Sequence, residues 1–303
     1  MRSDHVLCLN SKSFHRMHYV EWGDPAAERV VICAHGLTRN GRDFDALAQA
    51  LLPDFRVVCP DVVGRGRSDW LPAKEDYAYP QYCADMVNLI ARVTANPAPG
   101  GLLGRLARAM GSGNRKPTRI YWVGTSMGGI IGMLLASRPN YPIEKLVLND
   151  VGTVIPRAAL ERIAQYVGKD PRFKTFEELE AMMRLVLAPF GALTDAQWRH
   201  LTETAAKQHE DRSWGLRYDP GIGVPFRGPF ADVDLWQYWD TISCPTLLLR
   251  GAQSDLLLKD TAVAMTRRGP KPKLVEFDGI GHAPALMSRE QIEPIRAFLR
   301  SAG

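Results

Sequence analysis

Ser126 lies between small residues in an otherwise apolar stretch, WVGTSMGGIIGMLLA. Gly124 and Gly128 stand two residues before it and two residues after it, and we call this pentapeptide the elbow. The run TRIYWVG before the serine predicts a strand, and the apolar residues after it predict a helix. A serine at such a junction occupies a sharp turn whose neighbours must lack bulk, and the strained backbone directs its hydroxyl above the sheet. The pattern predicts a nucleophile, with a tight turn around an idle serine as the alternative.

A serine hydroxyl is a poor nucleophile at neutral pH, so this hypothesis requires a histidine base and an acid that orients it, in the chain order serine, acid, histidine. His282 follows the predicted strand KLVEFDG in a glycine-rich loop, and we expect it to be the base. Asp255, after the predicted strand PTLLLRG, is the acid that we favour. Asp150 ends the strand after the elbow and is a rival in an alternative layout, whereas Asp260 is expected to begin or cap a helix.

The oxyanion of such a reaction needs two N–H donors placed where the carbonyl oxygen becomes tetrahedral. Met127, directly after the serine, would supply one donor, and the helix N-terminus beneath it favours negative charge. Leu37, in the loop VVICAHGLTRNG, would supply the other, because Gly36 lets the backbone turn there. We interpret His35 as a structural residue that holds this loop, and direct catalysis by His35 is the less favoured interpretation.

Short β-branched runs alternate with helical patterns through the first half of the chain, which favours a parallel sheet flanked by helices. Residues 43–52 and 82–93 carry apolar side chains at helical spacing. The sequence Gly23-Asp24-Pro25 is typical of the turn of an antiparallel hairpin. The rhythm resumes near the C-terminus, with helices expected at 260–268 and 289–300. The predicted strands are HRMHYVEW, RVVICAH, FRVVCPDVV, TRIYWVG, KLVLNDVG, CPTLLLRG and KLVEFDG.

The segment 153–235 interrupts this rhythm and has almost no strand signal. It contains two capping boxes, in which side chains satisfy free N–H groups at helix starts. We therefore expect a helical insertion here, between two core segments, 1–152 and 236–303. The capping boxes pair Thr175 with Glu178 and Thr194 with Gln197.

A second insertion, Asn96–Pro117, is flanked by Gly, Pro and Ser and is expected to form a solvated loop. The alternative is a short basic helix that touches an anionic surface. Its apolar face would consist of Leu102, Leu103, Leu106 and Met110.

The 303 residues are 46% hydrophobic, enough for one large domain or a domain with a substantial insertion. No apolar run is typical of a signal peptide or reaches the roughly 20 residues needed to span a bilayer, so we expect a cytoplasmic location. The five scattered cysteines lack CxxC spacing, which argues against a disulfide framework or thiolate metal site. The net charge of +5 equals the five basic residues within 100–119, so no nucleic-acid surface is indicated. A homo-oligomer is left open.

The motifs HGLT, DVVGRGRSD, GTSMGG, RGAQSD and GHAP, in this order and spacing, resemble the α/β-hydrolase superfamily, specifically its cap-bearing serine hydrolases. The resemblance covers nearly the whole chain. It implies a mostly parallel, twisted sheet of about eight strands flanked by helices, with a helical cap inserted after the sixth strand, where 153–235 lies. It places Asp61 and Arg65 in a segment that shapes the core beneath the site, and we interpret both as structural.

Haloalkane dehalogenases and epoxide hydrolases of this fold use an aspartate at the elbow, and the epoxide hydrolases commonly carry a proline after the HGx segment. Ser126 and Thr38 occupy these positions here, so neither activity is expected. No metal-ligand cluster, phosphate loop or dinucleotide fingerprint accompanies the site, so we expect no cofactor and no metal. We expect hydrolysis of a small-molecule carboxylic ester with a small to medium acyl chain, through an acyl-enzyme intermediate.

The segment that returns from the cap, FRGPFADVDLWQYWD, is rich in aromatic side chains. We expect them to line an apolar acyl pocket, with docking of the cap by its tryptophans as the alternative. The same catalytic residues would serve a lactonase, a thioesterase or a carbon–carbon bond hydrolase. A cofactor-free perhydrolase or haloperoxidase, and a ligand receptor with little turnover, also stay open. The candidate substrate-binding residues are Phe226, Phe230, Trp236, Tyr238 and Trp239.

Overall fold

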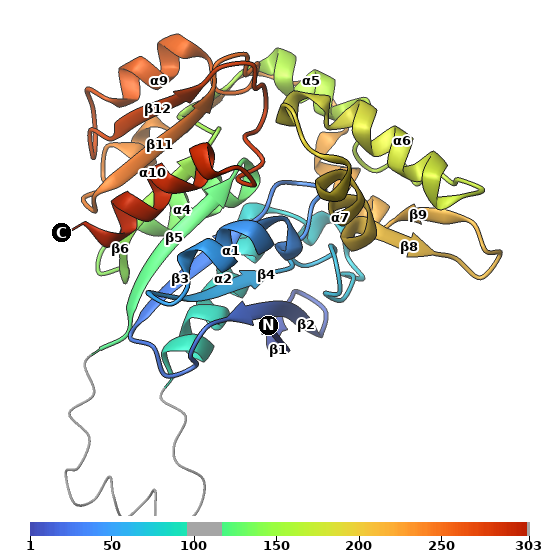
Figure 1. Ribbon diagram of the computed structural model, residues 1–303, viewed down its shortest axis with the longest axis horizontal. Helices are drawn as coiled ribbons and strands as arrows, with labels where there is room; N and C mark the ends of the chain where they lie inside the picture. Colours follow the sequence, from blue (N-terminus) through green and yellow to red (C-terminus); the bar gives the residue numbers. More distant parts are fainter. Residues whose placement is uncertain (96–116, 302–303) are drawn as a thin grey trace, which may run out of the picture.

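The computed structural model describes residues 1–95 and 117–301. Its main sheet has eight strands in the order β1-β2-β4-β3-β5-β6-β11-β12 (Figure 1). Strand β2 pairs antiparallel with β1 and β4, and the neighbours from β4 to β12 are parallel. The expected mostly parallel sheet of about eight strands is therefore confirmed. The strands are β1 (Arg2–Leu9), β2 (Phe14–Trp22), β3 (Arg29–Ala34), β4 (Arg56–Pro60), β5 (Arg119–Thr125), β6 (Ile143–Asn149), β11 (Thr246–Gly251) and β12 (Lys273–Phe277).

Helices cover both faces of the sheet (Figure 1). Successive side chains of a strand point to opposite faces, so Trp122 packs on one side and Val123 on the other. One face is covered by α1 (Asp45–Leu51) and α10 (Arg289–Arg300). The other face is covered by α2 (Tyr79–Thr94), α4 (Met127–Ala136), α8 (Trp236–Trp239) and α9 (Lys259–Met265). Because both faces are buried, the central strands read as nearly continuous apolar runs.

A crevice forms where the strand order reverses. From β3 the chain continues to β4 on one side and then to β5 on the other. The loops that follow β3 and β5 diverge, and ligands of open α/β sheets bind at the carboxyl ends of the strands at such a point. Leu37 follows β3 and Ser126 follows β5, so the topology brings both to this crevice.

The cap lies between β6 and β11, across one end of the sheet (Figure 1). Near the two ends of the cap, β7 (Val154–Ile155) pairs antiparallel with β10 (Val233–Asp234). This pairing supports the proposed cap boundaries of 153–235. Both expected capping boxes form, at the starts of α6 (Phe176–Val186) and α7 (Asp195–Ala205). The cap also contains α5 (Arg157–Ala164), η3 (Ala188–Phe190), η4 (Pro220–Phe226) and a hairpin of β8 (Ala206–Gln208) and β9 (Trp214–Leu216), so it is not purely helical.

The N-terminal hairpin differs from the expectation. Its partner strand, β1, was not predicted, and its turn lies at Asn10–Ser13, where the Asn10 N–H donates to the Ser13 carbonyl at 2.9 Å. The Gly23-Asp24-Pro25 turn instead connects β2 to β3, which are not neighbours in the sheet. The β1 strand alternates exposed and buried residues, as expected at a sheet edge that faces water on one side.

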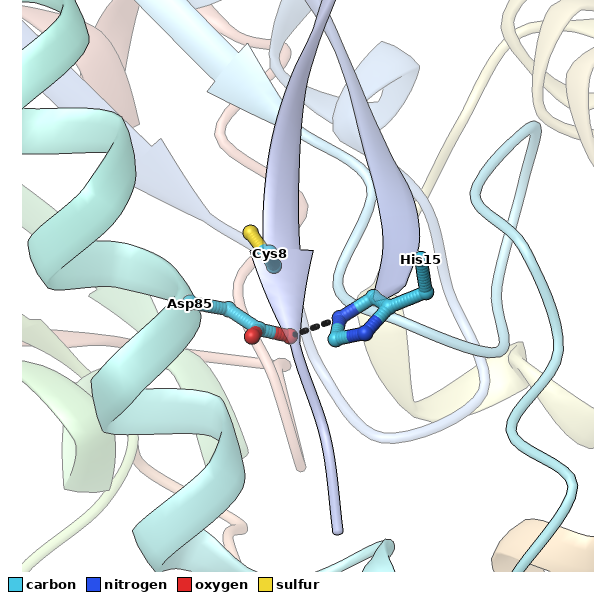
Figure 2. Close-up of side chains that lie close together, drawn as sticks. All are labelled: Cys8, His15 and Asp85. Atoms are coloured by element: carbon cyan, nitrogen blue, oxygen red, sulfur yellow. Dashed lines mark hydrogen bonds and ion pairs between the residues drawn. The ribbon is translucent and has the colours of Figure 1, made fainter. Parts of the chain in front are cut away.

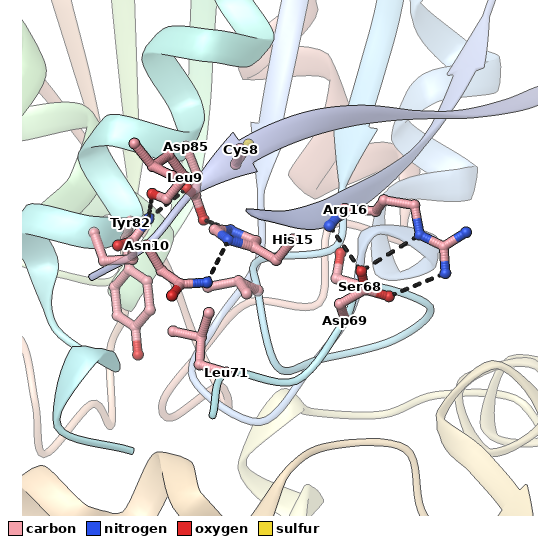
Figure 3. A network of polar contacts seen from close by, with 12 residues as sticks. Cys8, Leu9, Asn10, His15, Arg16, Ser68, Asp69, Leu71, Tyr82 and Asp85 are labelled. Carbon is pink, nitrogen blue, oxygen red and sulfur yellow. Dashed lines mark hydrogen bonds and ion pairs between the residues drawn. The ribbon is translucent and has the colours of Figure 1, made fainter. Parts of the chain in front are cut away.

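A buried polar cluster joins this hairpin to α2. Figure 2 shows Cys8 from β1, His15 from β2 and Asp85 from α2 converging, with His15 Nε2 2.9 Å from Asp85 Oδ2. The wider network in Figure 3 adds Asn10, whose amide lies 3.2 Å from His15 Nδ1. The Gln81 side chain donates to Asp85 Oδ1 at 2.7 Å. These hydrogen bonds satisfy side chains that would otherwise be costly to bury.

The three side chains offer ligand atoms within 4.8 Å of one another, a spacing compatible with a metal site. However, His15 and Asp85 already have hydrogen-bond partners, and burial raises the pKa of the Cys8 thiol to about 12. We therefore interpret the cluster as a structural contact between the hairpin and α2.

In residues 1–95 and 117–301, no helix is both long enough and apolar enough to cross a membrane. The predicted excursion at 96–117 lies outside the described residues, except for Pro117. The helix considered for Leu102, Leu103, Leu106 and Met110 therefore has no structural description.

Candidate active site

The elbow is a tight turn that leaves no room for a side chain at Gly124 or Gly128. Ser126 has φ 52° and ψ −118°, a conformation that an L-residue rarely adopts. A Cβ atom on Gly124 would lie 2.3 Å from the Gly128 carbonyl oxygen, and one on Gly128 would lie 2.0 Å from the Ala34 carbonyl oxygen. Any larger residue at either position would collide with backbone. Two N–H groups of α4, from Gly129 and Ile130, donate to the Ser126 carbonyl and fix the turn.

Ser126, His282 and Asp150 form one chain of hydrogen bonds. His282 Nε2 lies 3.0 Å from Ser126 Oγ, and His282 Nδ1 lies 2.7 Å from Asp150 Oδ2. The imidazole is 16% exposed, so reactants can reach it, whereas the Asp150 side chain is fully buried. A base that contacts the hydroxyl and is oriented by a carboxylate is the arrangement that nucleophilic serine chemistry needs.

Asp150 is held by the loop after the neighbouring strand. It follows β6 with φ 55°, and its Oδ1 accepts from the Gly251 N–H at 2.8 Å. Its Oδ2 also accepts from the Ser254 hydroxyl at 2.6 Å, while Ser254 Oγ accepts the N–H groups of Leu256 and Leu257. Sequence reasoning missed Ser254, and its only signal is its place in RGAQSD.

The expectation that Asp255 contacts His282 is wrong. Its carboxylate turns away and forms a bidentate ion pair with Arg162 of α5, at 2.5 and 3.0 Å. The Asp255 and Arg162 side chains are 53% and 39% exposed. Asp150 and Asp255 both follow strands that end at the same edge of the sheet, so strand order alone does not separate them. The left-handed backbone of Asp150 directs that carboxylate under the imidazole. Asp260 lies in the first turn of α9, as expected.

A buried asparagine ties the histidine loop to the elbow. Asn149, the last residue of β6, donates from its side-chain amide to the Pro284 carbonyl at 2.9 Å and to Thr125 Oγ1 at 3.0 Å. Pro284 stands two residues after His282, and Thr125 directly precedes Ser126. Asn149 therefore fixes the position of both loops relative to each other.

Leu37 and Met127 both line the cavity at Ser126. Among the described residues, neither backbone N–H has a hydrogen-bond acceptor, which leaves both donors free. Arg65 connects them: its fully buried guanidinium donates to the Leu37 carbonyl at 2.8 Å and contacts the Met127 sulfur at 3.7 Å. Asp61 is also buried and accepts the Gly41 and Arg67 N–H groups, so both residues occupy structural positions.

His35 is fully buried beneath the loop that carries Leu37. Its Nδ1 lies 2.7 Å from the Gly36 carbonyl oxygen, and its Nε2 accepts the Val62 N–H at 2.9 Å. These contacts assign the proton to Nδ1 and place the imidazole in a structural role. Burial lowers the pKa of His35 to about 4, despite the hydrogen bond to Gly36, which favours the charged form.

His35 should make the protein sensitive to acid. Between about pH 6.5 and pH 4 the unfolded chain binds a proton at His35 that the folded chain does not bind, so the free energy of unfolding falls as the pH falls. The full effect of this one group is about 3 kcal/mol. Urea unfolding at several pH values, compared with His35→Gln, measures it. Glutamine can accept the Val62 N–H without titrating, so an equally steep pH dependence in the variant would contradict the assignment.

Two cavities meet at Ser126. The first, of about 730 Å³, is lined mainly by apolar side chains, and we call it the apolar pocket. The second, of about 620 Å³, has residues of the cap and of the core in its wall, and we call it the charged pocket. Ser126 and Leu37 line both, whereas His282 lines only the charged pocket. The permanently charged residues of the charged pocket are Arg39, Asp43, Arg162, Lys169 and Asp255.

The aromatic residues of the return segment divide into two groups. Phe226, Phe230 and Tyr238 line the apolar pocket. Trp236 and Trp239 line neither pocket, so their assignment to substrate binding is wrong. Trp239 is fully buried and donates its Nε1–H to the Arg268 carbonyl at 3.1 Å, and the Arg268 guanidinium lies 4.1 Å from the Trp236 ring centre. Both belong to α8, which already packs on the core.

Comparisons with known proteins identify the family of this chain. The alpha/beta hydrolase family matches residues 31–294. The 3-hydroxybutyrate-oligomer hydrolase of Cupriavidus necator is 45% identical over 306 residues, which cover 98% of this chain and 97% of the relative. The crystal structure of a protein from Rickettsia typhi has a TM-score of 0.86 and 30% identity, with 100% of both chains covered. An alpha/beta hydrolase from Novosphingobium aromaticivorans has a TM-score of 0.80 and 32% identity, with 98% of both covered. This chain belongs to the alpha/beta hydrolase family.

Proposed function

We propose that this protein is a serine hydrolase that cleaves the ester bonds of 3-hydroxybutyrate oligomers through an acyl-enzyme intermediate. The observation that carries ester hydrolysis is the hydrogen-bonded chain of Ser126, His282 and Asp150 at the meeting point of two cavities. The substrate class is supported by the full-length similarity to the Cupriavidus necator oligomer hydrolase. The match covers nearly all of both chains and therefore includes the cap, which is expected to shape a similar pocket in the two proteins.

Each residue has a defined task in this proposal. Ser126 attacks the ester carbonyl while His282 takes the hydroxyl proton, and Asp150 orients the imidazole and stabilises its charged form. The Leu37 and Met127 N–H groups stabilise the oxyanion. His282 then gives the proton to the departing alkoxide. Water, activated by the same histidine, releases the acyl group and restores Ser126.

The two cavities suggest an orientation for the bound ester. The departing oxygen must lie within reach of His282 Nε2, and only the charged pocket is lined by His282. We therefore assign the alcohol part of the ester to the charged pocket and the acyl part to the apolar pocket. Phe226 and Phe230 would then contact the acyl chain, whose methyl and methylene groups suit an apolar wall.

Incubation with defined dimers and trimers of 3-hydroxybutyrate tests the proposal. We expect release of 3-hydroxybutyrate at rates above those for p-nitrophenyl esters of similar acyl length. Chromatography of the reaction mixture measures this release. Turnover of p-nitrophenyl esters without turnover of the oligomers would retain a serine esterase and reject the substrate class. An unchanged rate in Ser126→Ala would reject the site itself.

A further inference from the structure

The charged pocket contains more positive than negative charge. Arg39 pairs with Asp43, with Nε–Oδ2 and Nη2–Oδ1 distances of 2.8 and 2.7 Å. Arg162 pairs with Asp255 in the same bidentate manner. Lys169 is the fifth permanently charged residue of the lining, and its ammonium has no hydrogen bond or ion pair among the described residues. Within each pair the arginine and the aspartate compensate each other, so among the described residues Lys169 is left as the unpaired cation of this cavity.

The backbone of Lys169 is held while its ammonium is free. The Tyr218 hydroxyl donates to the Lys169 carbonyl at 2.8 Å. The preceding Gly168 has φ 76°, and a Cβ atom there would lie 3.0 Å from the Gly223 Cα and the Pro220 carbonyl oxygen, so the chain after α5 is closely packed against η4 at this point. Lys169 is therefore an exposed, strongly hydrated charge on a flexible stem that starts from a fixed position in the pocket wall.

Oligomers of a hydroxy acid differ from simple esters in their leaving group. The alcohol part of every internal ester bond is the fragment that ends in the free carboxyl group. At neutral pH that fragment carries a negative charge. Under the direction assigned above, it occupies the charged pocket, where the unpaired cation lies.

We propose that Lys169 binds the terminal carboxylate of the departing fragment, so that the enzyme reads oligomers from their carboxyl end. This inference rests on the proposed function and adds a specificity-determining residue to it. Lys169 contacts the far end of the substrate and takes no part in the bond changes at Ser126. Its effect is on binding, and it should appear mainly in KM.

The experiment compares the free acid of the 3-hydroxybutyrate dimer with its primary carboxamide, which is neutral and nearly the same size. We expect the wild-type protein to cleave the acid with a kcat/KM about three- to fivefold above that of the amide, the effect of one exposed charge pair. The ratio should decrease as ionic strength rises, because salt screens such a pair. In Lys169→Met the acid-to-amide ratio should fall to about one, and in Lys169→Arg it should persist.

Lys174→Met is the matched control. Lys174 is another exposed cap lysine, it lies outside both cavities, and its replacement changes the net charge equally. The ratio should stay at the wild-type value in this variant. A wild-type ratio near one, or a ratio that Lys169→Met leaves intact, would overturn the proposal while oligomer hydrolysis stands. Failure to cleave either dimer would instead reject the proposed function.

Discussion

Replacing Ser126 with alanine is expected to lower kcat/KM for ester substrates by about 10⁴- to 10⁶-fold. The change removes the nucleophile that lies 3.0 Å from His282 and leaves the oxyanion donors and both cavities in place. Alanine needs no more room than serine, and among the described residues the Ser126 hydroxyl forms a hydrogen bond only with His282. Initial rates on p-nitrophenyl butyrate and on the 3-hydroxybutyrate dimer measure the loss.

Thermal unfolding of both proteins provides the control for folding. We expect the variant to unfold within a few degrees of the wild-type protein, since it loses one partly exposed hydrogen bond. A folded variant that keeps more than about a tenth of the activity would show that Ser126 is not the nucleophile.

Replacing Asp150 with asparagine is expected to lower kcat by about 10³- to 10⁴-fold, whereas Asp255→Asn should cost less than about tenfold. An amide at position 150 no longer stabilises the imidazolium, and it favours the tautomer of His282 that cannot accept the Ser126 proton. Asp255 instead pairs with Arg162 and makes no hydrogen bond to His282. Steady-state kinetics on one ester for the two variants side by side measures the contrast.

The two variants control for each other, because each exchanges one carboxylate for an isosteric amide. Asp150 is buried and accepts from Gly251 and Ser254, so a circular dichroism melt must accompany its kinetics. A folded Asp150→Asn protein with nearly full activity, together with an inactive Asp255→Asn protein, would restore the sequence-based prediction that Asp255 is the acid.

Much of the fold could be predicted because its signals are local. The apolar runs of β3, β5, β6 and β11 reflect burial on both faces, and the two capping boxes of the cap report on hydrogen bonds within four residues. β1 is harder to predict, since its sequence RSDHVLCL has four polar residues followed by four apolar residues, without the alternation typical of an edge strand, and it takes its register from its neighbour.

The sequence by itself determined the elbow, the base and the strands that precede the residues of the site. Gly124 and Gly128 are required by contacts within a few residues of Ser126 and with the adjacent strand, and those contacts follow from a strand-to-helix turn of this sharpness. The glycine-rich loop of His282 similarly follows directly from the last strand of the sheet.

Only the tertiary structure decided which carboxylate meets His282, which aromatic residues face a cavity, and where an unpaired cation stands. Asp150 and Asp255 follow adjacent strands at the same edge of the sheet. The φ angle of Asp150 turns its carboxylate toward His282, whereas Asp255 pairs with Arg162, 93 residues away in the chain. Trp236 and Phe226 are ten positions apart in one aromatic segment, yet the first packs on Arg268 and the second lines the apolar pocket. Side-chain direction depends on contacts between segments that are distant in the chain, and a one-dimensional pattern does not contain these contacts.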